Sequence, residues 1–326
     1  MQEGVGVEAG FKPSDYEAAG AAIVSDYDEL LGEGNIFLKI QVVCLQDGML
    51  ELVDPLKKGS VIVGFMSPFK YIHNIQSLAD RELTTFSMEL VPRISRAQRM
   101  DALSAMSSAA GYKAVLLAAS TLNKFFPLMM TAAGTISPAN VLVIGAGVAG
   151  LQAIATAKRL GARVKAFDTR PIVKEQVESL GAEFVSLETS DEAQTSGGYA
   201  EEMSEDFYQH EHAIIGEHLP TTDAVITTAQ IFGKRAPLLI TEEMLQTMRY
   251  GSVIVDLAAE QGGNCELTVP GKNVERHGVN ILSPLDLPSS LSYHTSEMFS
   301  RNAVSYTHLR AHETPEHLGC RLGVEK

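Results

Sequence analysis

The sequence predicts an α/β protein made of two doubly wound parallel-sheet domains. Apolar runs of strand length alternate with segments of helical spacing, and this alternation favours parallel strands joined by helices. A glycine-rich turn at Gly145–Gly150 joins one of these runs to a helix-like segment. The 326 residues are enough for two domains, and a composition of 45% hydrophobic and 20% charged residues is typical of globular proteins.

The first domain is expected over residues 1–91. Its expected strands share apolar content and strand length: residues 36–43, 61–66 and 84–90. A strand-like segment follows Met1 almost at once, so we expect that a first βα unit is missing. Residues 290–304 are expected to complete this domain.

The second domain is expected over residues 92–289 and begins with a long helix that links the two domains. Pro92 ends the preceding strand, Ser95 and Gln98 have capping-box spacing, and an Ala-, Leu- and Met-rich stretch continues to about Leu122. The strands expected beyond it are short apolar runs: residues 141–144, a run ending at Asp168, 183–187, 224–229, 252–258 and 279–282. Helical segments separate them, which predicts a parallel sheet.

The C-terminal segment 305–326 differs from the rest of the chain. It breaks the alternating pattern and carries three of the nine histidines. It resembles translated sequencing-adapter read-through, so we expect that this tail is not part of the natural protein.

The composition excludes several function classes. A net charge of −14 disfavours nonspecific nucleic-acid binding. The three cysteines form no CxxC pattern, which fits a reducing compartment. The longest apolar stretch contains three glycines and Gln152, and no signal peptide is visible. We therefore expect a chain that is soluble as it stands, with no direct membrane insertion.

The glycine-rich turn carries the clearest chemistry. In the pattern Gly145-x-Gly147-x-x-Gly150, the first glycine permits a tight turn, the second lets a pyrophosphate approach, and the third lets the helix pack on the strand. Asp168 ends the next strand, where an acid binds the adenosine ribose hydroxyls and repels a 2′-phosphate. This combination predicts a Rossmann-like domain that binds NAD in preference to NADP.

Further cofactor contacts are expected where strands of this domain end, because doubly wound folds place ligands there. Glu260 is either a polar neighbour of the nicotinamide or a plain loop residue. The other expected contacts are Val148, Thr169, Arg170, Thr228 and Ala229. No metal site is expected, since His210 and His212 are two residues apart on a predicted helix and point in different directions.

A second motif, VPRISRAQRMD, contains Arg93, Gln98 and Asp101 at the base of the long helix. By composition alone this segment is best interpreted as a polar helix start, with solvated arginines, Gln98 in the capping box and Asp101 on an exposed face. A resemblance changes this interpretation.

The segments VPRISRAQRMD, GAGVAGLQAIATAKRLGA, SGGYAEEM and VIVDLAAEQGGNCELTVPG together resemble the NAD(H)-binding component, domain I, of the alpha subunit of proton-translocating NAD(P)⁺ transhydrogenases, which are related to alanine dehydrogenases. The resemblance runs from about residue 4 to about Val304. It implies a nucleotide cleft between two α/β domains. Arg93, Gln98, Asp101 and Ser104 match the segment at the nicotinamide end of the cofactor.

The resemblance also implies partners. Tyr199 and Met203 match the family's mobile loop, which closes over bound nucleotide. NAD(H) would bind this chain and NADP(H) a partner component, while a membrane component moves protons. The chain would form a homodimer at the cytoplasmic or mitochondrial matrix face of an energy-transducing membrane. Its Re/Si-specific, proton-translocating transhydrogenase activity would require these partner components.

Direct hydride transfer between two nicotinamides needs positioning but no catalytic acid. An alanine dehydrogenase must move protons on its substrate and would use a histidine and a lysine. Met88 and Glu89 stand where that histidine is expected, and Gln41 stands at the place of the lysine. The alternatives are an alanine-dehydrogenase-like enzyme and an NAD-binding fragment without turnover.

Overall fold

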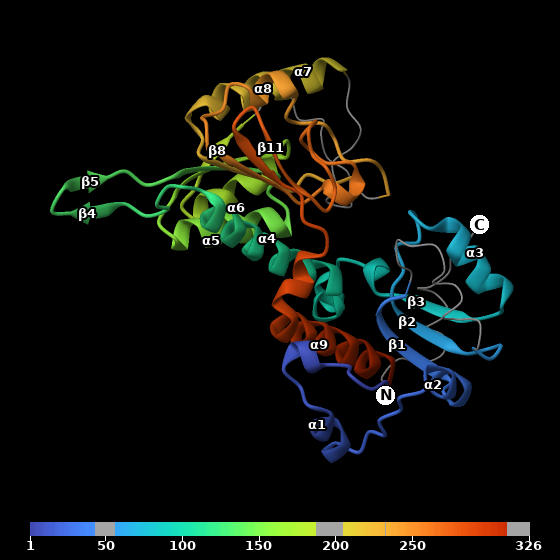
Figure 1. Ribbon diagram of the computed structural model, residues 1–326. Helices are drawn as coiled ribbons and strands as arrows, with labels where there is room; N and C mark the ends of the chain where they lie inside the picture. The colour runs from blue at the N-terminus through green and yellow to red at the C-terminus, as the bar shows by residue number, and fades with distance from the viewer. Residues whose placement is uncertain (43–55, 187–204, 232, 312–326) are drawn as a thin grey trace. The chain divides into compact units, whose positions relative to one another are not determined.

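The computed structural model describes residues 1–42, 56–186, 205–231 and 233–311 (Figure 1). The chain divides into two compact units. Unit 1 comprises Met1–Met106 and Leu291–Lys326, and unit 2 comprises Ser107–Ser290. Each unit contains helices and a sheet whose strands are all or mainly parallel, which confirms the predicted α/β class.

Unit 2 contains a seven-stranded sheet of order β11-β12-β10-β9-β6-β7-β8. Its strands are β6 (Asn140–Ile144), β7 (Arg163–Phe167), β8 (Glu183–Val185), β9 (Ala224–Thr227), β10 (Val253–Asp256), β11 (Asn273–Arg276) and β12 (Val279–Leu282). The parallel strands, numbered from β6 along the chain, follow the order 3-2-1-4-5-6 of dinucleotide-binding folds. Only β11, which the sequence did not predict, runs antiparallel, against β12.

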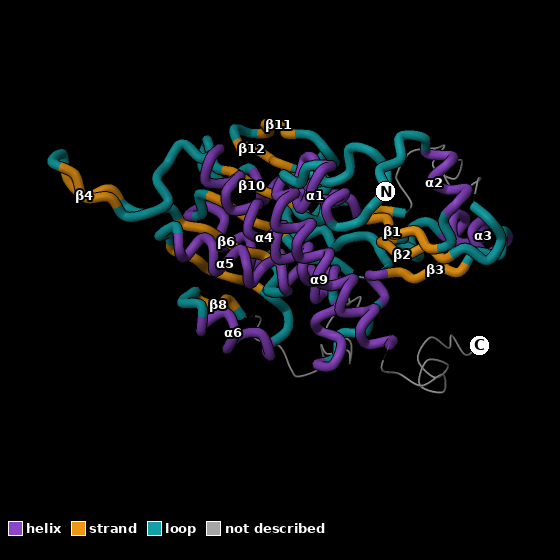
Figure 2. Tube along the Cα trace, turned by 90° about the horizontal axis from the view of Figure 1, so that it is seen from below, coloured by secondary structure: helices purple, strands orange, loops and turns teal. Residues whose placement is uncertain are grey.

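Helices cover both faces of this sheet. Successive strand residues point to opposite sides, so neighbouring residues of one strand lie in different core clusters. Val143 belongs to a core cluster with residues of α4 (Ala102–Thr121) and α5 (Val148–Arg159). Its neighbour Ile144 belongs to the other cluster, with Ile215 of α7 (Glu205–His218). Figure 1 shows α7 and α8 (Glu242–Leu245) on one side and α4, α5 and α6 (Lys174–Ser179) on the other, and Figure 2 shows α4 and α5 across the strands.

The long helix α4 is a core helix in its second half. Ala114, Val115 and Ala118 are fully buried in the first of those clusters. A Cβ on Gly111 would lie 2.0 Å from the carbonyl oxygen of Ala149 on α5, so this glycine permits close helix packing. Of the described helices, α4 is the one long and apolar enough to cross a membrane by length and composition.

The predicted start of α4 was wrong. Ser95 and Gln98 belong to a separate 3₁₀ turn, Ser95–Met100, that has no side-chain cap at its start. Asp101 instead accepts a hydrogen bond from the backbone N–H of Ser104 at 2.9 Å, which is the bond of an N-cap residue. The helix begins directly after this aspartate, because its carboxylate satisfies one of the free N–H donors of the first turn.

Unit 1 contains a three-stranded parallel sheet of order β1-β2-β3. Its strands and helices are β1 (Ile36–Gln41), β2 (Val61–Phe65), β3 (Thr84–Ser87), α1 (Pro13–Ala18), α2 (Tyr27–Glu33) and α3 (Ile72–Asp80). Ile62 and Leu78 lie in its small core. The C-terminal helix α9 (Ser292–Ala311) packs on this unit, where Tyr293 stacks on Phe11 with ring centroids 5.5 Å apart.

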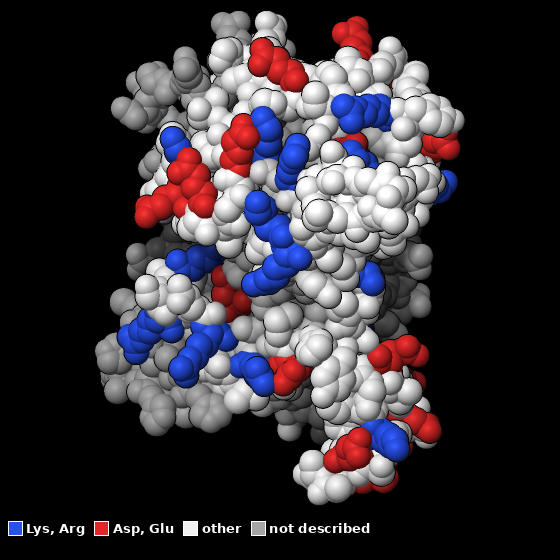
Figure 3. Space-filling view, turned by 90° about the vertical axis from the view of Figure 1, so that its left-hand side faces the viewer, with Lys and Arg blue, Asp and Glu red and all other residues white. Residues whose placement is uncertain are grey.

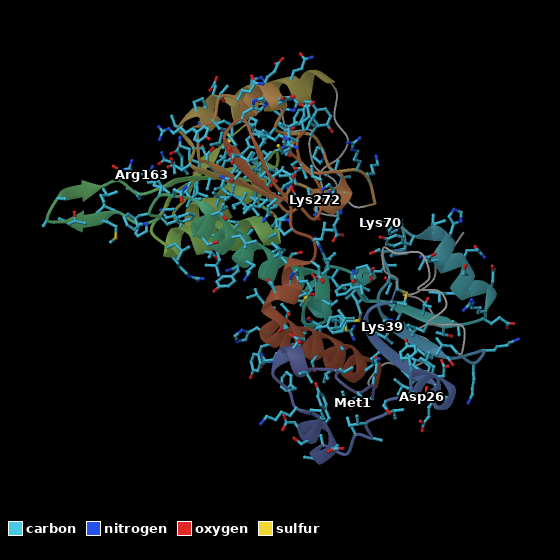
Figure 4. All side chains as sticks on the ribbon, in the orientation of Figure 1. Met1, Asp26, Lys39, Lys70, Arg163 and Lys272 are labelled. Carbon is cyan, nitrogen blue, oxygen red and sulfur yellow. The ribbon has the colours of Figure 1, made fainter. Side chains whose placement is uncertain are left out.

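A hairpin of β4 (Met129–Thr131) and β5 (Gly134–Ile136) projects from unit 2. Its base lies at the end of the sheet where β7 begins, near Arg163, which Figure 4 labels. Leu128 and Met130 are 50% and 81% exposed. In Figure 3 the hairpin faces the viewer as an uncharged surface with Lys and Arg side chains beside it.

Candidate functional site

The three glycines of the turn between β6 and α5 have different geometric roles. Gly145 has a φ of 96°, and a Cβ on it would lie 2.6 Å from Oγ1 of Thr228. A Cβ on Gly150 would lie 1.8 Å from the Gly145 carbonyl oxygen, so a side chain there would separate turn and helix. Both positions therefore require glycine for the fold itself.

Gly147 has no such constraint from the fold. Its φ is −75°, and among the described residues no atom lies within 4 Å of a Cβ built on it. It is the N-cap of α5, and Val148, the first residue of that helix, is partly exposed. The first turn of a helix has free N–H donors and a positive dipole end, which together bind anions. The open space beside Gly147 thus fits a pyrophosphate.

Asp168 directly follows β7 and is 7% exposed. Its Oδ2 accepts a hydrogen bond from the backbone N–H of Ala146 at 2.7 Å, which ties it to the glycine-rich turn. Arg170 donates to both carboxylate oxygens, from Nε at 2.9 Å and Nη2 at 3.0 Å. The hydrogen bond to Asp168 raises the pKa of Arg170 above its usual value, although burial opposes this. Thr169, between them, is half-buried.

Thr228 and Ala229 follow β9 and lie against the same turn. Thr228 Oγ1 donates to the carbonyl oxygen of Gly145 at 2.9 Å. The Ala229 N–H donates to Oδ1 of Asn264 at 3.1 Å, and Nδ2 of Asn264 donates back to the Ala229 carbonyl at 2.9 Å. The fully buried Asn264 was not predicted from the sequence, because its partners lie 35 residues away.

Asp256, at the end of β10, holds the neighbouring loop together. Its carboxylate is fully buried and accepts hydrogen bonds from the Thr268 hydroxyl at 2.6 Å and the Asn264 N–H at 2.9 Å, among others.

Glu260, four residues after Asp256, is exposed on a short 3₁₀ turn. Burial raises the pKa of the Cys265 thiol to about 11, so this cysteine is a poor nucleophile.

The polar motif of unit 1 forms a linked cluster around Asp101. The Asp101 Oδ2 accepts a hydrogen bond from the Ser104 hydroxyl at 2.6 Å and lies 3.9 Å from Nε of Arg93. Its side chain is 13% exposed, so the interpretation that placed Asp101 on an exposed face was wrong. Gln98 is exposed. Tyr199 and Met203 lie outside the described residues.

The residues that replace the expected dehydrogenase histidine have structural contacts. Met88 is 2% exposed. Glu89 accepts hydrogen bonds from the backbone N–H groups of Met66 and Ser67 and from the Ser87 hydroxyl. This carboxylate therefore joins the ends of β2 and β3.

The described residues contain no group of three or more His, Cys, Asp or Glu side chains that could hold a metal. His212 Nε2 lies 2.7 Å from the Leu238 carbonyl oxygen, and His210 is exposed.

The strand order, the glycine-rich turn and the buried acid after the second strand define a Rossmann-like dinucleotide-binding protein. Comparison with known proteins agrees. Residues 1–110 match the family model "Alanine dehydrogenase/PNT, N-terminal domain", and residues 114–318 match "Alanine dehydrogenase/PNT, C-terminal domain". The chain belongs to the alanine dehydrogenase/PNT family.

Curated relatives refine the position within this family. The first part of NAD(P) transhydrogenase subunit alpha from Rickettsia prowazekii is 45% identical over 94% of this chain and 80% of its own length. The Rhodospirillum rubrum protein of the same name is 46% identical with the same coverage. Alanine dehydrogenase of Bacillus subtilis is 27% identical over 89% of this chain and 71% of its own length. The crystal structure of transhydrogenase from Sinorhizobium meliloti is 39% identical and covers 95% of this chain and 83% of its own, with a TM-score of 0.82.

Proposed function

We propose that the chain is the NAD(H)-binding component of a Re/Si-specific, proton-translocating NAD(P)⁺ transhydrogenase. It would exchange hydride between NAD(H) on this chain and NADP(H) on a partner component, and a membrane component would couple this exchange to proton movement. The observation that carries the proposal is the 45% and 46% identity to transhydrogenase alpha subunits, against 27% to an alanine dehydrogenase. The site of action would be the cytoplasmic or mitochondrial matrix face of an energy-transducing membrane.

Unit 2 supplies the nucleotide-binding part of this proposal. The free N–H donors at the start of α5 would hold the pyrophosphate beside Gly147. Asp168 would accept the ribose hydroxyls, which requires Arg170 to release at least one carboxylate oxygen. Thr228 and Ala229 would keep the turn rigid through their hydrogen bonds to Gly145 and Asn264. A site that is already rigid loses less conformational entropy when a nucleotide binds to it.

Unit 1 supplies the groups proposed for the nicotinamide end. Arg93 and Gln98 are donors of the kind that hold a carboxamide, and Asp101 orients Arg93 and Ser104. Direct hydride exchange requires two rings at near-attack distance with water excluded, and no proton donor. Tyr199 and Met203 are proposed to close over the nucleotide. Glu260 is proposed as a polar neighbour of the ring.

The hairpin supports the proposal of a homodimer. An isolated two-stranded hairpin is marginally stable in water, and this one exposes Leu128, Met130 and Ile136. A second copy of the chain would cover them. Sedimentation equilibrium should show a dimer for the wild type and a monomer for Met130→Asp. Tyr250→Asp, at another exposed apolar residue of unit 2, is the matched control and should remain dimeric.

The test of the activity is partner-dependent hydride transfer. The chain is mixed with the NADP(H)-binding component of a transhydrogenase, and reduction of an NAD analogue by NADPH is followed by absorbance. We expect reduction with both components and none with either alone. NADH binding without transfer in the mixture would contradict the proposal and support a nucleotide-binding fragment.

The same preparation distinguishes the second enzyme of the family. Alanine and NAD⁺ are added to the chain alone, and NADH formation is followed. We expect no alanine-dependent NADH, because Glu89 accepts hydrogen bonds from the backbone just after β2 and the buried Met88 has no titratable proton. NADH formation would favour an alanine-dehydrogenase-like enzyme over the transhydrogenase component.

A further inference from the structure

Glu211, in α7, is a buried acid that the proposed function does not use. It is 4% exposed. Residues four apart share a helix face, so Glu211 lies on the same face as Ile215, which packs with Phe167 in the core between α7 and the sheet. Phe167 directly precedes Asp168. The buried face of α7 therefore reaches the end of β7 that carries the predicted ribose acid.

Among the described residues, little surrounds Glu211 that could balance its charge. Among the described residues no group hydrogen-bonds to its carboxyl, and Asp168 is the charged group that acts on it. Burial, and secondly the like charge of Asp168, raise the pKa of Glu211 to about 7. On the same helix, His210 is exposed and His212 is bonded to the Leu238 carbonyl. From α8, the uncharged Met244 faces α7 at Gly216.

The ribose acid itself is neutralised in this structure. Arg170 forms a two-point ion pair with Asp168, so the two charges nearly cancel. A guanidinium is also a favoured ligand of phosphate. A neutral Asp168–Arg170 pair therefore provides little repulsion against the 2′-phosphate of NADP(H). A further negative charge near this site would strengthen the selection of NAD(H).

We propose that Glu211 is a second specificity-determining acid of the adenosine ribose site, whose buried negative charge opposes the 2′-phosphate of NADP(H). The inference rests on the proposed NAD(H) site in unit 2. Since the pKa of Glu211 is raised to about 7, the charge is present above that pH and is lost below it. Discrimination against NADP(H) therefore weakens on acidification.

The test compares dissociation constants of NADH and NADPH, from fluorescence titration of the full chain at about pH 6 and about pH 8.5. We expect the wild-type ratio of Kd for NADPH to Kd for NADH to be about tenfold larger at the higher pH. Glu211→Gln removes the charge and should lower the ratio at the higher pH to near its acidic value. Glu211→Asp should restore part of the discrimination.

A control separates this effect from titration of the ligand. The 2′-phosphate itself titrates at a pKa of about 6 and contributes a pH dependence that every variant shares. Glu217→Gln, on an exposed position of the same helix, should keep the wild-type ratio and profile. A pH dependence of the Kd ratio that is lost in Glu211→Gln but remains in Glu217→Gln is therefore caused by Glu211.

Two results overturn the inference. One is a Glu211→Gln variant with the wild-type ratio at both pH values. The other, which needs no variant to fold, is a wild-type ratio that changes with pH no more than titration of the 2′-phosphate, measured on free NADPH, accounts for. The proposed function fails in a distinguishable way: a chain that binds NADH with this pH-dependent discrimination, but shows no partner-dependent hydride transfer, contradicts the transhydrogenase proposal alone.

Discussion

Arg170 holds both carboxylate oxygens of Asp168, at 2.9 and 3.0 Å, across the end of β7. The acid that would bind the ribose is thus already occupied by a side chain two residues away. The hydroxyl groups of a bound ribose must therefore replace at least one of the two hydrogen bonds from Arg170 to Asp168.

The first prediction concerns this exchange. Arg170→Met leaves Asp168 negative and free of its competitor, so NADH affinity should be kept or increased while NADPH affinity falls about tenfold. Fluorescence titration with both nucleotides measures the two constants. Arg163→Met, at the exposed opposite end of β7, is the control and should change neither. An increase in NADPH affinity in Arg170→Met would contradict the prediction.

The second prediction separates two glycines of the turn. Gly147→Ala should leave the thermal unfolding temperature near that of the wild type, because open space surrounds a Cβ there, and it should weaken NADH binding at least tenfold by blocking the pyrophosphate. Gly150→Ala should lower stability by about 1–3 kcal/mol, because its Cβ would meet the Gly145 carbonyl. Differential scanning fluorimetry and NADH titration check both. A Gly147→Ala variant with undiminished NADH affinity would exclude the proposed pyrophosphate position.

The third prediction concerns packing of α4 on α5. Gly111→Ala should destabilise unit 2 by about 1–3 kcal/mol, because the added Cβ meets the Ala149 carbonyl. Gly216→Ala on α7 is the matched control, since a Cβ there only touches Met244 at 3.9 Å. It should stabilise by about 0.5–1 kcal/mol through a lower backbone entropy cost. Urea unfolding gives both values, and equal effects of the two substitutions would refute the close contact.

The fourth prediction separates two roles of Asp101. Asp101→Asn keeps an N-cap side chain for α4 but loses the charge near Arg93, whereas Asp101→Ala loses both. Stability should therefore fall by about 1 kcal/mol only in Asp101→Ala. Partner-dependent hydride transfer should fall in both variants, because each removes the negative charge that faces Arg93. Unchanged transfer in Asp101→Asn would limit Asp101 to a structural role.

The fifth prediction is a pH dependence of stability caused by Glu211. Its pKa is raised from 4.5 to about 7 in the folded chain, so folding favours the protonated acid. The stability that this proton contributes is complete below about pH 4.5 and is lost as the pH rises through about 7. Glu211→Gln should thus be more stable than the wild type by about 2–3 kcal/mol near pH 8, and the gain should vanish toward pH 4.5.

Urea unfolding of both proteins across this pH range measures the difference, with Glu217→Gln as the exposed control. A gain in stability that is constant with pH would show that Glu211 is not the titrating group.

Much of unit 2 could be predicted from the sequence because its signals are local. An apolar strand, a glycine-rich turn and an acid at the next strand end lie within Val141–Asp168, and the structure has strand, turn and helix there. Residue spacing also predicted β12 without error, as Val279–Leu282. The antiparallel strand β11 was not predicted, because its mostly exposed residues, two of them charged, lack the apolar pattern of a buried strand.

The sequence by itself determined the α/β class and the glycine-rich turn, because strand alternation and the backbone freedom of glycine act between near neighbours. Only the tertiary structure decided what the acids do. Asp101 caps a helix, Asp256 holds a loop, Asp168 pairs with Arg170, and Glu211 is buried on α7. An acidic residue has no fixed role along a chain, since its burial and partners are set by which distant elements pack around it.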